Sequence, residues 1–319
     1  MNVLDDMMLV YRVAKSYYID KMGQSEIAKM LGISRPQISR LIKRASELGI
    51  VKIDVSMPET LNVSDLEREL TSCLGLVKSI IIPSTQMGKS NNFFAAAARH
   101  VTSCLEYCVN IGLGWGRTVY NISKHLAYQS GENKVVFYPL VGCSGDDNPY
   151  LQINSITDRF AEHYHARARY LNLPVFRKDD QLTAEEEQRL TVFQNKWGRL
   201  DGAVVGIGEF NSEDRIYIDE VSYDPYLLEH KYEIVGDVLA HLLLQDGREL
   251  FLPGYSHIAC SLENLTRMPE VIGVARGVWK TDAIYHVARG KYIKTLITDD
   301  ITAKSILSKY GFKENIVKP

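Results

Sequence analysis

The sequence has few of the features that secreted and membrane proteins need. Its five cysteines are odd in number and follow no regular spacing, which favours a reducing compartment over a disulfide framework. No apolar run approaches the length needed to cross a bilayer. The N-terminus carries Asp5 and Asp6 and has no apolar segment of the secretory type. These absences predict a cytoplasmic protein with no membrane partner.

Motifs for metal binding and nucleotide hydrolysis are also absent. Cys104 and Cys108 are four residues apart, but no His or Cys near them completes a metal site, so both are predicted to be core residues. His163 and His165 are two apart in a predicted helix and point to different faces. No Gly-Lys-Ser/Thr follows a glycine-rich loop, which argues against nucleoside triphosphate hydrolysis. The sequence predicts no resident metal and no cofactor.

Charge is nearly balanced overall but unevenly distributed. The net charge is −2 over 319 residues, a length that favours two domains. Residues 21–52 hold seven Lys and Arg against two acids, so the remainder of the chain is acidic. A basic surface confined to one N-terminal module is typical of a nucleic-acid-binding domain.

Residues 24–48 have the pattern of a helix-turn-helix that reads DNA. A short helix from Ser25 to Leu31 is predicted to end at Gly32, which can adopt the positive φ of a sharp turn. Ser34 opens a second helix through a capping box with Gln37. One face of this helix is apolar at helical spacing, at Ile38, Leu41, Ile42 and Ala45.

The opposite face of the second helix is polar and basic. Arg and Gln can read guanine and adenine edges in the major groove, while Lys and Ser suit phosphates. The predicted DNA-binding residues are Ser34, Arg35, Gln37, Ser39, Arg40, Lys43 and Arg44. The alternative is an amphipathic surface helix with a solvated basic face. The agreement of cap, turn and charge favours the DNA-binding interpretation.

Short elements flank this module. A helix from about residue 4 to 20 is predicted to complete its core, and residues 50–57 alternate as in a short strand or wing. Residues 58–64 are predicted to be a linker, and Ser64 to cap a helix that ends near residue 74 and connects the domains or pairs with a second subunit. The predicted organisation is a DNA-binding domain at 1–57, a connecting segment at 58–76 and a second domain at 77–319.

From residue 77 onward, apolar strands alternate with helices. Strands are predicted at 77–83, 108–114, 134–142, 202–208, 270–275 and 292–298. Helices are predicted at 92–107, 117–126, 153–170 and 184–196, and from Lys280 and Asp299. This alternation indicates an α/β fold with a mostly parallel sheet covered on both faces. Such folds bind ligands at the carboxyl ends of their strands.

Four glycine-bearing loops follow predicted strands, at 112–118, 142–146, 206–209 and 275–280. In the first, backbone N–H groups, Arg117 and Thr118 could hold a phosphate, although spacing alone fits a tight strand-to-helix turn equally well. Lys280 could pair with a ligand phosphate, which we favour, or extend along a helix start. Asp237 could accept a sugar hydroxyl or cap a helix through Leu244. Convergence of the four loops in one crevice favours a phosphorylated ligand.

The two halves together resemble the SorC family of bacterial sugar-responsive transcriptional regulators over nearly the whole chain. The matching segments are GQSEIAKMLGISRPQISRLIKRASELGIVKI, GLGWGRT, FYPLVG, LPVF, VVGIG, VGDVLAHLLLQDG, VIGVARGVWKTDAI and LITDDITAKSIL. The resemblance implies a winged-helix-like helix-turn-helix domain and an effector domain related to sugar-phosphate isomerases and deaminases. It also implies a homo-oligomer, a dimer or tetramer, whose affinity for double-stranded operator DNA is set by a phosphorylated sugar.

The resemblance also implies which residues bind the effector. They are Gly114, Trp115, Gly116, Arg117, Thr118, Gly142, Ser144, Asn154, Gly208, Asp237 and Lys280. Two positions depart from the family pattern. Cys143 and Arg276 stand where many members have glycine, and their larger side chains would narrow the pocket or add a phosphate contact.

Two further inferences concern the DNA site and a rival function. Modules related by two-fold symmetry predict a palindromic operator. The rival is a sugar-phosphate isomerase or deaminase that carries a DNA-binding domain. Such an enzyme needs a carboxylate base within hydrogen-bond reach of the substrate, and Glu209 or Asp146 are the candidates. Neither residue lies in a catalytic motif, which favours the regulator.

Overall fold

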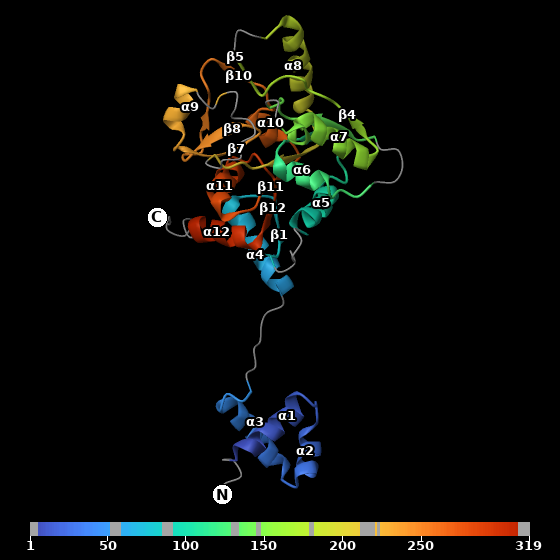
Figure 1. The fold of residues 1–319 in the computed structure, drawn as a ribbon, viewed down its shortest axis with the longest axis vertical. Coiled ribbons are helices and arrows are strands. Elements are labelled where there is room, and N and C mark those ends of the chain that lie inside the picture. Colours follow the sequence, from blue (N-terminus) through green and yellow to red (C-terminus); the bar gives the residue numbers. More distant parts are fainter. Residues whose placement is uncertain are drawn as a thin grey trace. The chain divides into compact units, whose positions relative to one another are not determined.

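A computed structural model describes residues 6–51, 59–84, 92–128, 134–144, 148–178, 182–210, 221 and 224–311. The chain divides into two compact units, Met1–Pro58 and Glu59–Pro319. Each unit has its own hydrophobic core, and each is described separately below (Figure 1).

The N-terminal unit contains three helices, α1 (Met7–Tyr18), α2 (Gln24–Leu31) and α3 (Arg35–Glu47). The turn after α2 is made by Gly32 at φ 67°, and Ser34 and Gln37 form both hydrogen bonds of the predicted capping box at the start of α3. The predicted apolar face of α3 is buried in the unit's core, together with Val10, Val13 and Ile27. The turn, the cap and the buried face of α3 are therefore confirmed. Most of the predicted wing lies outside the described residues.

A seven-stranded parallel sheet forms the centre of the C-terminal unit, in the order β1-β12-β11-β6-β2-β3-β4. The strands are β1 (Lys78–Ile82), β2 (Asn110–Leu113), β3 (Val136–Pro139), β4 (Arg167–Ala168), β6 (Gly202–Gly206), β11 (Glu270–Val274) and β12 (Thr295–Asp299). Most residues of these strands are buried. This agrees with their continuous apolar sequences, which are typical of strands covered on both faces. The predicted parallel α/β fold is confirmed.

Helices cover both faces of this sheet (Figure 1). One group is α5 (Asn92–Cys104), α6 (Arg117–Ser123) and α7 (Ile153–Tyr164). A second group is α4 (Glu59–Leu74), α11 (Thr281–Arg289) and α12 (Asp300–Tyr310). From β1 to β4 the chain advances toward one edge of the sheet, and from β4 to β12 it returns toward the other edge. Because parallel crossovers are right-handed, connections that run in opposite directions lie on opposite faces of the sheet.

The remaining helical segments lie around the sheet and its hairpins. They are η2 (Pro149–Leu151), α8 (Ala184–Trp197), α9 (Pro225–His230), α10 (Leu262–Arg267) and η4 (Val278–Lys280). Thr183 and Glu186 form a capping box at the start of α8. No helix in the described part of the chain is long and apolar enough to cross a membrane.

Two predicted boundaries are wrong. The helix expected to begin at Ser64 begins at Glu59, so residues 59–63 are helical and do not form a linker. The helix expected to reach residue 170 ends at Tyr164, because His165 takes a left-handed conformation with φ 46°. The chain then enters the edge strand β4.

The segment around Asp237 is a β-hairpin, which corrects the predicted helix through Leu244. Strands β7 (Ile234–Val238), β8 (His241–Leu244) and β9 (Glu249–Leu250) form an antiparallel sheet. Leu239 and Ala240 make the turn between β7 and β8 with φ values of 53° and 63°. Such turns favour Asn and Gly, so this apolar pair gave no turn signal. A two-stranded antiparallel sheet pairs β5 (Phe176–Lys178) with β10 (Tyr255–His257), which is distant in the sequence.

Candidate functional site

The four glycine-bearing loops follow four strands that are neighbours in the sheet, β11, β6, β2 and β3. From β2 the chain proceeds to β3 and β4 on one side, and β6 then lies on the other side of β2. The strand order therefore reverses between β2 and β6, which is where open parallel sheets bind ligands. We call residues 114–118, 142–144, 207–209 and 275–280 the switch-point loops.

The loop after β2 is held closely against β6. The Gly114 N–H donates to Val204 O at 2.8 Å, and a Cβ on Gly114 would lie 3.3 Å from Val205 Cα. Gly116 takes φ 94° and precedes the exposed Arg117 and the half-buried Thr118 at the start of α6. Trp115 is only 7% exposed and belongs to the core.

Lys280, in the loop after β11, is influenced by three other charged residues. Lys280 Nζ donates to Ile207 O at 2.6 Å. Burial lowers the pKa of Lys280, Asp237 and Glu209 oppose that shift, and Arg117 adds to it. Arg117 and Lys280 thus place two cationic groups in different loops at the same edge of the sheet. Such an arrangement is suited to binding an anion.

Gly208 and Asp237 bring the β7–β8 hairpin against the loop after β6. Their backbones form an antiparallel bridge, with Gly208 N–H to Asp237 O at 2.9 Å and Asp237 N–H to Gly208 O at 3.2 Å. Asp237 is 4% exposed, and its Oδ2 accepts from the Ala240 N–H at 3.1 Å. Asp237 therefore stabilises the hairpin turn, and the predicted helix-capping role is wrong.

The loop after β3 is packed against the segment at 171–174. A Cβ on Gly142 would lie 2.6 Å from the carbonyl oxygens of Leu173 and Pro174. The Ser144 side chain is 1% exposed, and its hydroxyl has no hydrogen-bond partner among the residues that the structure describes. The Ser144 N–H donates to Gln152 Oε1 at 3.2 Å. A buried hydroxyl of this kind is expected to find a partner, such as a ligand or an ordered water.

The Asn154 amide forms three hydrogen bonds with the chain at 171–172. Its Nδ2 donates to Asn172 Oδ1 at 2.8 Å and to Leu171 O at 3.2 Å. Its Oδ1 accepts from the Leu171 N–H at 3.0 Å. These bonds tie the start of α7 to the chain at 171–172.

The loop after β11 carries Arg276, one of the two departures from the family pattern. Its guanidinium lies 5.0 Å from the ring centroid of Phe93 and 5.3 Å from that of Phe94, both in α5. Gly277 has φ 115°, and its N–H donates to Thr302 Oγ1 at 2.7 Å. Arg276 thus contacts α5 in this geometry and anchors the loop.

The polar face of α3 is open to solvent within the N-terminal unit. Ser34, Arg35, Ser39, Arg40 and Lys43 are exposed in that unit. The other two predicted DNA-binding residues are half-buried and engaged locally. The Gln37 Oε1 accepts from the Ser34 N–H at 3.0 Å, and Arg44 pairs with Glu47 at 3.3 Å.

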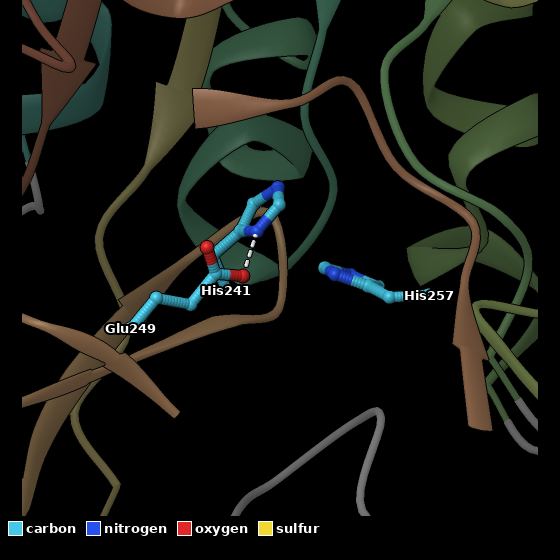
Figure 2. Close-up of side chains that lie close together, drawn as sticks. All are labelled: His241, Glu249 and His257. Carbon is cyan, nitrogen blue, oxygen red and sulfur yellow. Dashed lines mark hydrogen bonds and ion pairs between the residues drawn. The ribbon is translucent and has the colours of Figure 1, made fainter. Parts of the chain in front are cut away.

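A polar cluster that the sequence did not reveal lies beside the hairpin turn (Figure 2). It contains His241, Glu249 and His257, and His241 Nδ1 lies 2.5 Å from Glu249 Oε1. Burial, together with the neighbouring His241, lowers the pKa of His257 well below its ordinary value. The three residues are spaced eight apart and match no metal or catalytic motif, so only the fold brings them together.

Comparison with known proteins identifies the family. A family model described as "Putative sugar-binding domain" matches residues 59–308. The sorbitol operon regulator of Klebsiella pneumoniae is 30% identical over 318 residues, covering 95% of this chain and 98% of that protein. The chain belongs to the SorC family. The deoxyribonucleoside regulator of Bacillus subtilis is 25% identical, covering 94% of this chain and 97% of that protein.

Solved structures of transcriptional regulators show the same fold. The crystal structure of full-length SorC from Klebsiella pneumoniae has a TM-score of 0.69, with 26% identity, and covers 95% of this chain and 99% of that one. A transcriptional regulator from Streptococcus pneumoniae, at 24% identity and a TM-score of 0.71, shows the same fold over 80% of this chain and all of that one. As a SorC-family member, the protein is a sugar-responsive transcriptional regulator.

Proposed function

We propose that the switch-point loops bind a phosphorylated sugar and that this ligand sets the affinity of α3 for a palindromic operator. The observation that carries the proposal is the placement of two cationic residues, Arg117 and Lys280, in the loops after β2 and β11, the strands on either side of β6. A phosphate dianion held by both residues would form a charge-assisted hydrogen bond with each. The backbone N–H groups of residues 116–118 would complete the phosphate site.

The sugar itself would be held by the neighbouring loops. The buried hydroxyl of Ser144 and the carboxylate of Glu209 are the groups suited to sugar hydroxyls, because one can donate and the other can only accept. Gly142 and Gly208 allow other protein segments to pack closely against these loops. A Cβ at Gly142 would clash with the backbone at 173–174, and a Cβ at Gly208 would clash with Asp237. Trp115, Asn154 and Asp237 would act from behind, by fixing the loops and the hairpin turn.

The residues around the switch-point loops favour a regulator over a sugar-phosphate isomerase. An isomerase needs a carboxylate base aimed at a substrate carbon. The Asp237 carboxylate is committed to the hairpin turn, Glu209 interacts with Lys280, and Asp146 lies outside the described residues. Turnover of a sugar phosphate at ordinary enzyme rates would contradict this proposal.

The N-terminal unit would read DNA as a helix-turn-helix. Arg35 and Arg40 suit base edges, while Ser34, Ser39 and Lys43 suit phosphates. The Gln37 side chain bonds to the Ser34 N–H in the helix cap, so a base contact is less favoured for Gln37 than for Arg35 and Arg40. We propose a cytoplasmic homo-oligomer, a dimer or tetramer, because two such units must face two half-sites. Effector binding would change their spacing through a coupling free energy of about 1–3 kcal/mol.

A binding screen tests the effector assignment. The protein is titrated with sugar phosphates and with the matching free sugars, and binding is followed by thermal shift and calorimetry. One phosphorylated compound should raise the melting temperature, because a ligand specific for the native state stabilises it by mass action. Arg117→Ala and Lys280→Ala should each remove the shift. Arg267→Ala, just before the amino end of β11, is the matched control and should retain it. Equal stabilisation by a free sugar would refute the phosphate site.

A further inference from the structure

Three side chains that the proposed effector site does not use converge from three strands (Figure 2). His241 opens β8, Glu249 opens β9 and His257 ends β10. Glu249 pairs with Leu243, two residues from His241, so Glu249 and His241 lie on the same face of the hairpin. One nitrogen or oxygen from each of the three side chains lies within 4.8 Å of the others.

Hydrogen bonds behind the cluster orient both histidines. His241 Nε2 lies 2.9 Å from Cys260 O, and His257 Nε2 lies 3.1 Å from Leu239 O. A carbonyl can only accept, so each Nε2 carries the hydrogen. Each Nδ1 is then the nitrogen left to act as a ligand. Histidines that bind metals are held in this way, with the second ring nitrogen donating to a carbonyl or carboxylate.

Packing fixes the rings in place. The His257 ring stacks on Phe176, its partner across the β5–β10 pair, with 4.9 Å between ring centroids. The rings of His241 and His257 lie 4.4 Å apart at an interplanar angle of 69°. The side chains of His241 and Glu249 are 8% and 15% exposed. Three ionisable groups buried together are costly unless they are paired or bind a metal.

We propose that His241, Glu249 and His257 form a binding site for a divalent transition-metal ion of the zinc class. Two imidazole nitrogens and one carboxylate oxygen are a ligand set that zinc accepts, with a further position left for water or another ligand. Ca²⁺ and Mg²⁺ prefer oxygen ligands alone, so they should compete poorly.

Metal binding would displace one proton. The short contact between His241 Nδ1 and Glu249 Oε1 holds a proton, whichever atom carries it. When the ion binds, this proton leaves to solvent, and both atoms become ligands. They must also move apart, since ligand atoms at about 2.0–2.1 Å from zinc in a tetrahedral arrangement cannot remain in hydrogen-bond contact.

The ion would link β8, β9 and β10 beside the turn at Leu239 and Ala240. The Ala240 N–H of that turn donates a hydrogen bond to Asp237, which contacts the loop after β6. None of the three residues belongs to the switch-point loops, so the proposal does not depend on the identity of the effector.

Calorimetry with Zn²⁺ tests the site directly. The full-length protein, with any affinity tag removed, is stripped with a chelator, desalted and titrated with Zn²⁺. One ion should bind per chain. Glu249→Gln, which keeps the side-chain size, and His257→Phe, which keeps a ring against Phe176, should each weaken binding at least about 10- to 100-fold, the loss seen even for outer partners of metal ligands. His125→Ala, an exposed histidine outside the cluster, should bind as the wild type.

A spectroscopic measurement covers the case in which one variant fails to fold. Co²⁺ bound in place of Zn²⁺ should give visible absorption in the wild type that Glu249→Gln abolishes, while circular dichroism shows an unchanged fold. Absence of a bound ion, or binding that Glu249→Gln leaves unaltered, would show that the cluster is a metal-free hydrogen-bond network and would overturn the proposal. A loss of effector binding with Zn²⁺ binding retained would bear only on the phosphate site.

Discussion

A Cβ atom on Gly208 would lie 1.8 Å from Oδ1 of the buried Asp237. The two residues also exchange backbone hydrogen bonds, so the loop after β6 and the β7–β8 hairpin can approach this closely only while position 208 has no side chain. The contact joins the switch-point loops to the turn that adjoins the histidine cluster.

Gly208→Ala should therefore destabilise the C-terminal unit. Overpacking in a closely packed interior costs about 1–3 kcal/mol, and here it would also separate the bridging backbones. Urea denaturation measures the loss in the free energy of unfolding. Gly198→Ala is the matched control, because its φ is −70° and its nearest contacts are 3.7 and 3.9 Å away. Equal stability of the two variants would mean that the close approach is not required.

Ser34→Ala should loosen the first turn of α3. The Ser34 hydroxyl caps the Gln37 N–H, and loss of such a cap costs about 1 kcal/mol. Hydrogen exchange of peptides covering residues 34–38 should accelerate about fivefold, the factor that corresponds to this free energy. Ser46→Ala, exposed on the same helix but away from the cap, should exchange as the wild type does. If both variants behave alike, the capping box does not stabilise the helix.

Arg40→Ala and Lys43→Ala should affect DNA binding differently. Loss of a base contact costs about 1–3 kcal/mol and relaxes specificity, whereas loss of a phosphate contact weakens binding to all sequences and lowers the salt dependence by about one ion. Fluorescence anisotropy on operator and random duplexes at several salt concentrations separates the two effects. Equal losses on both duplexes for Arg40→Ala would contradict its assignment to a base.

Much of this fold could be predicted because its signals are local. The apolar runs at β1 and β6 and the capping boxes at Ser34 and Thr183 each specify an element from a few neighbouring residues. The β7–β8 hairpin could not be predicted, since Leu239 and Ala240 hold left-handed conformations without Gly or Asn. Their apolar sequence is as compatible with a helix as with two strands. Here burial in the core outweighs local preference.

The site divides in the same way. Adjacency of the four switch-point loops follows from the parallel alternation, because carboxyl ends of parallel strands share one edge. The histidine cluster does not, since His241, Glu249 and His257 meet only through the unpredicted hairpin and the β5–β10 pair. Nor does the sequence reveal that the Asn154 amide bonds to Leu171 and Asn172, because those residues follow α7, whose end at Tyr164 was not predicted.

Lys280 should make the free energy of unfolding depend on pH in the alkaline range. Burial lowers its pKa in the folded protein, so between that value and about 10.4, its ordinary value, the unfolded chain binds more protons than the native one. Stability contributed by this group therefore rises with pH across that interval, and Lys280→Met should remove the rise. The phosphorylated effector should reverse the effect, because an anion beside Lys280 favours its charged form. Denaturation at several alkaline pH values, with and without effector, measures both. An identical pH dependence in wild type and Lys280→Met would exclude Lys280 as the titrating group.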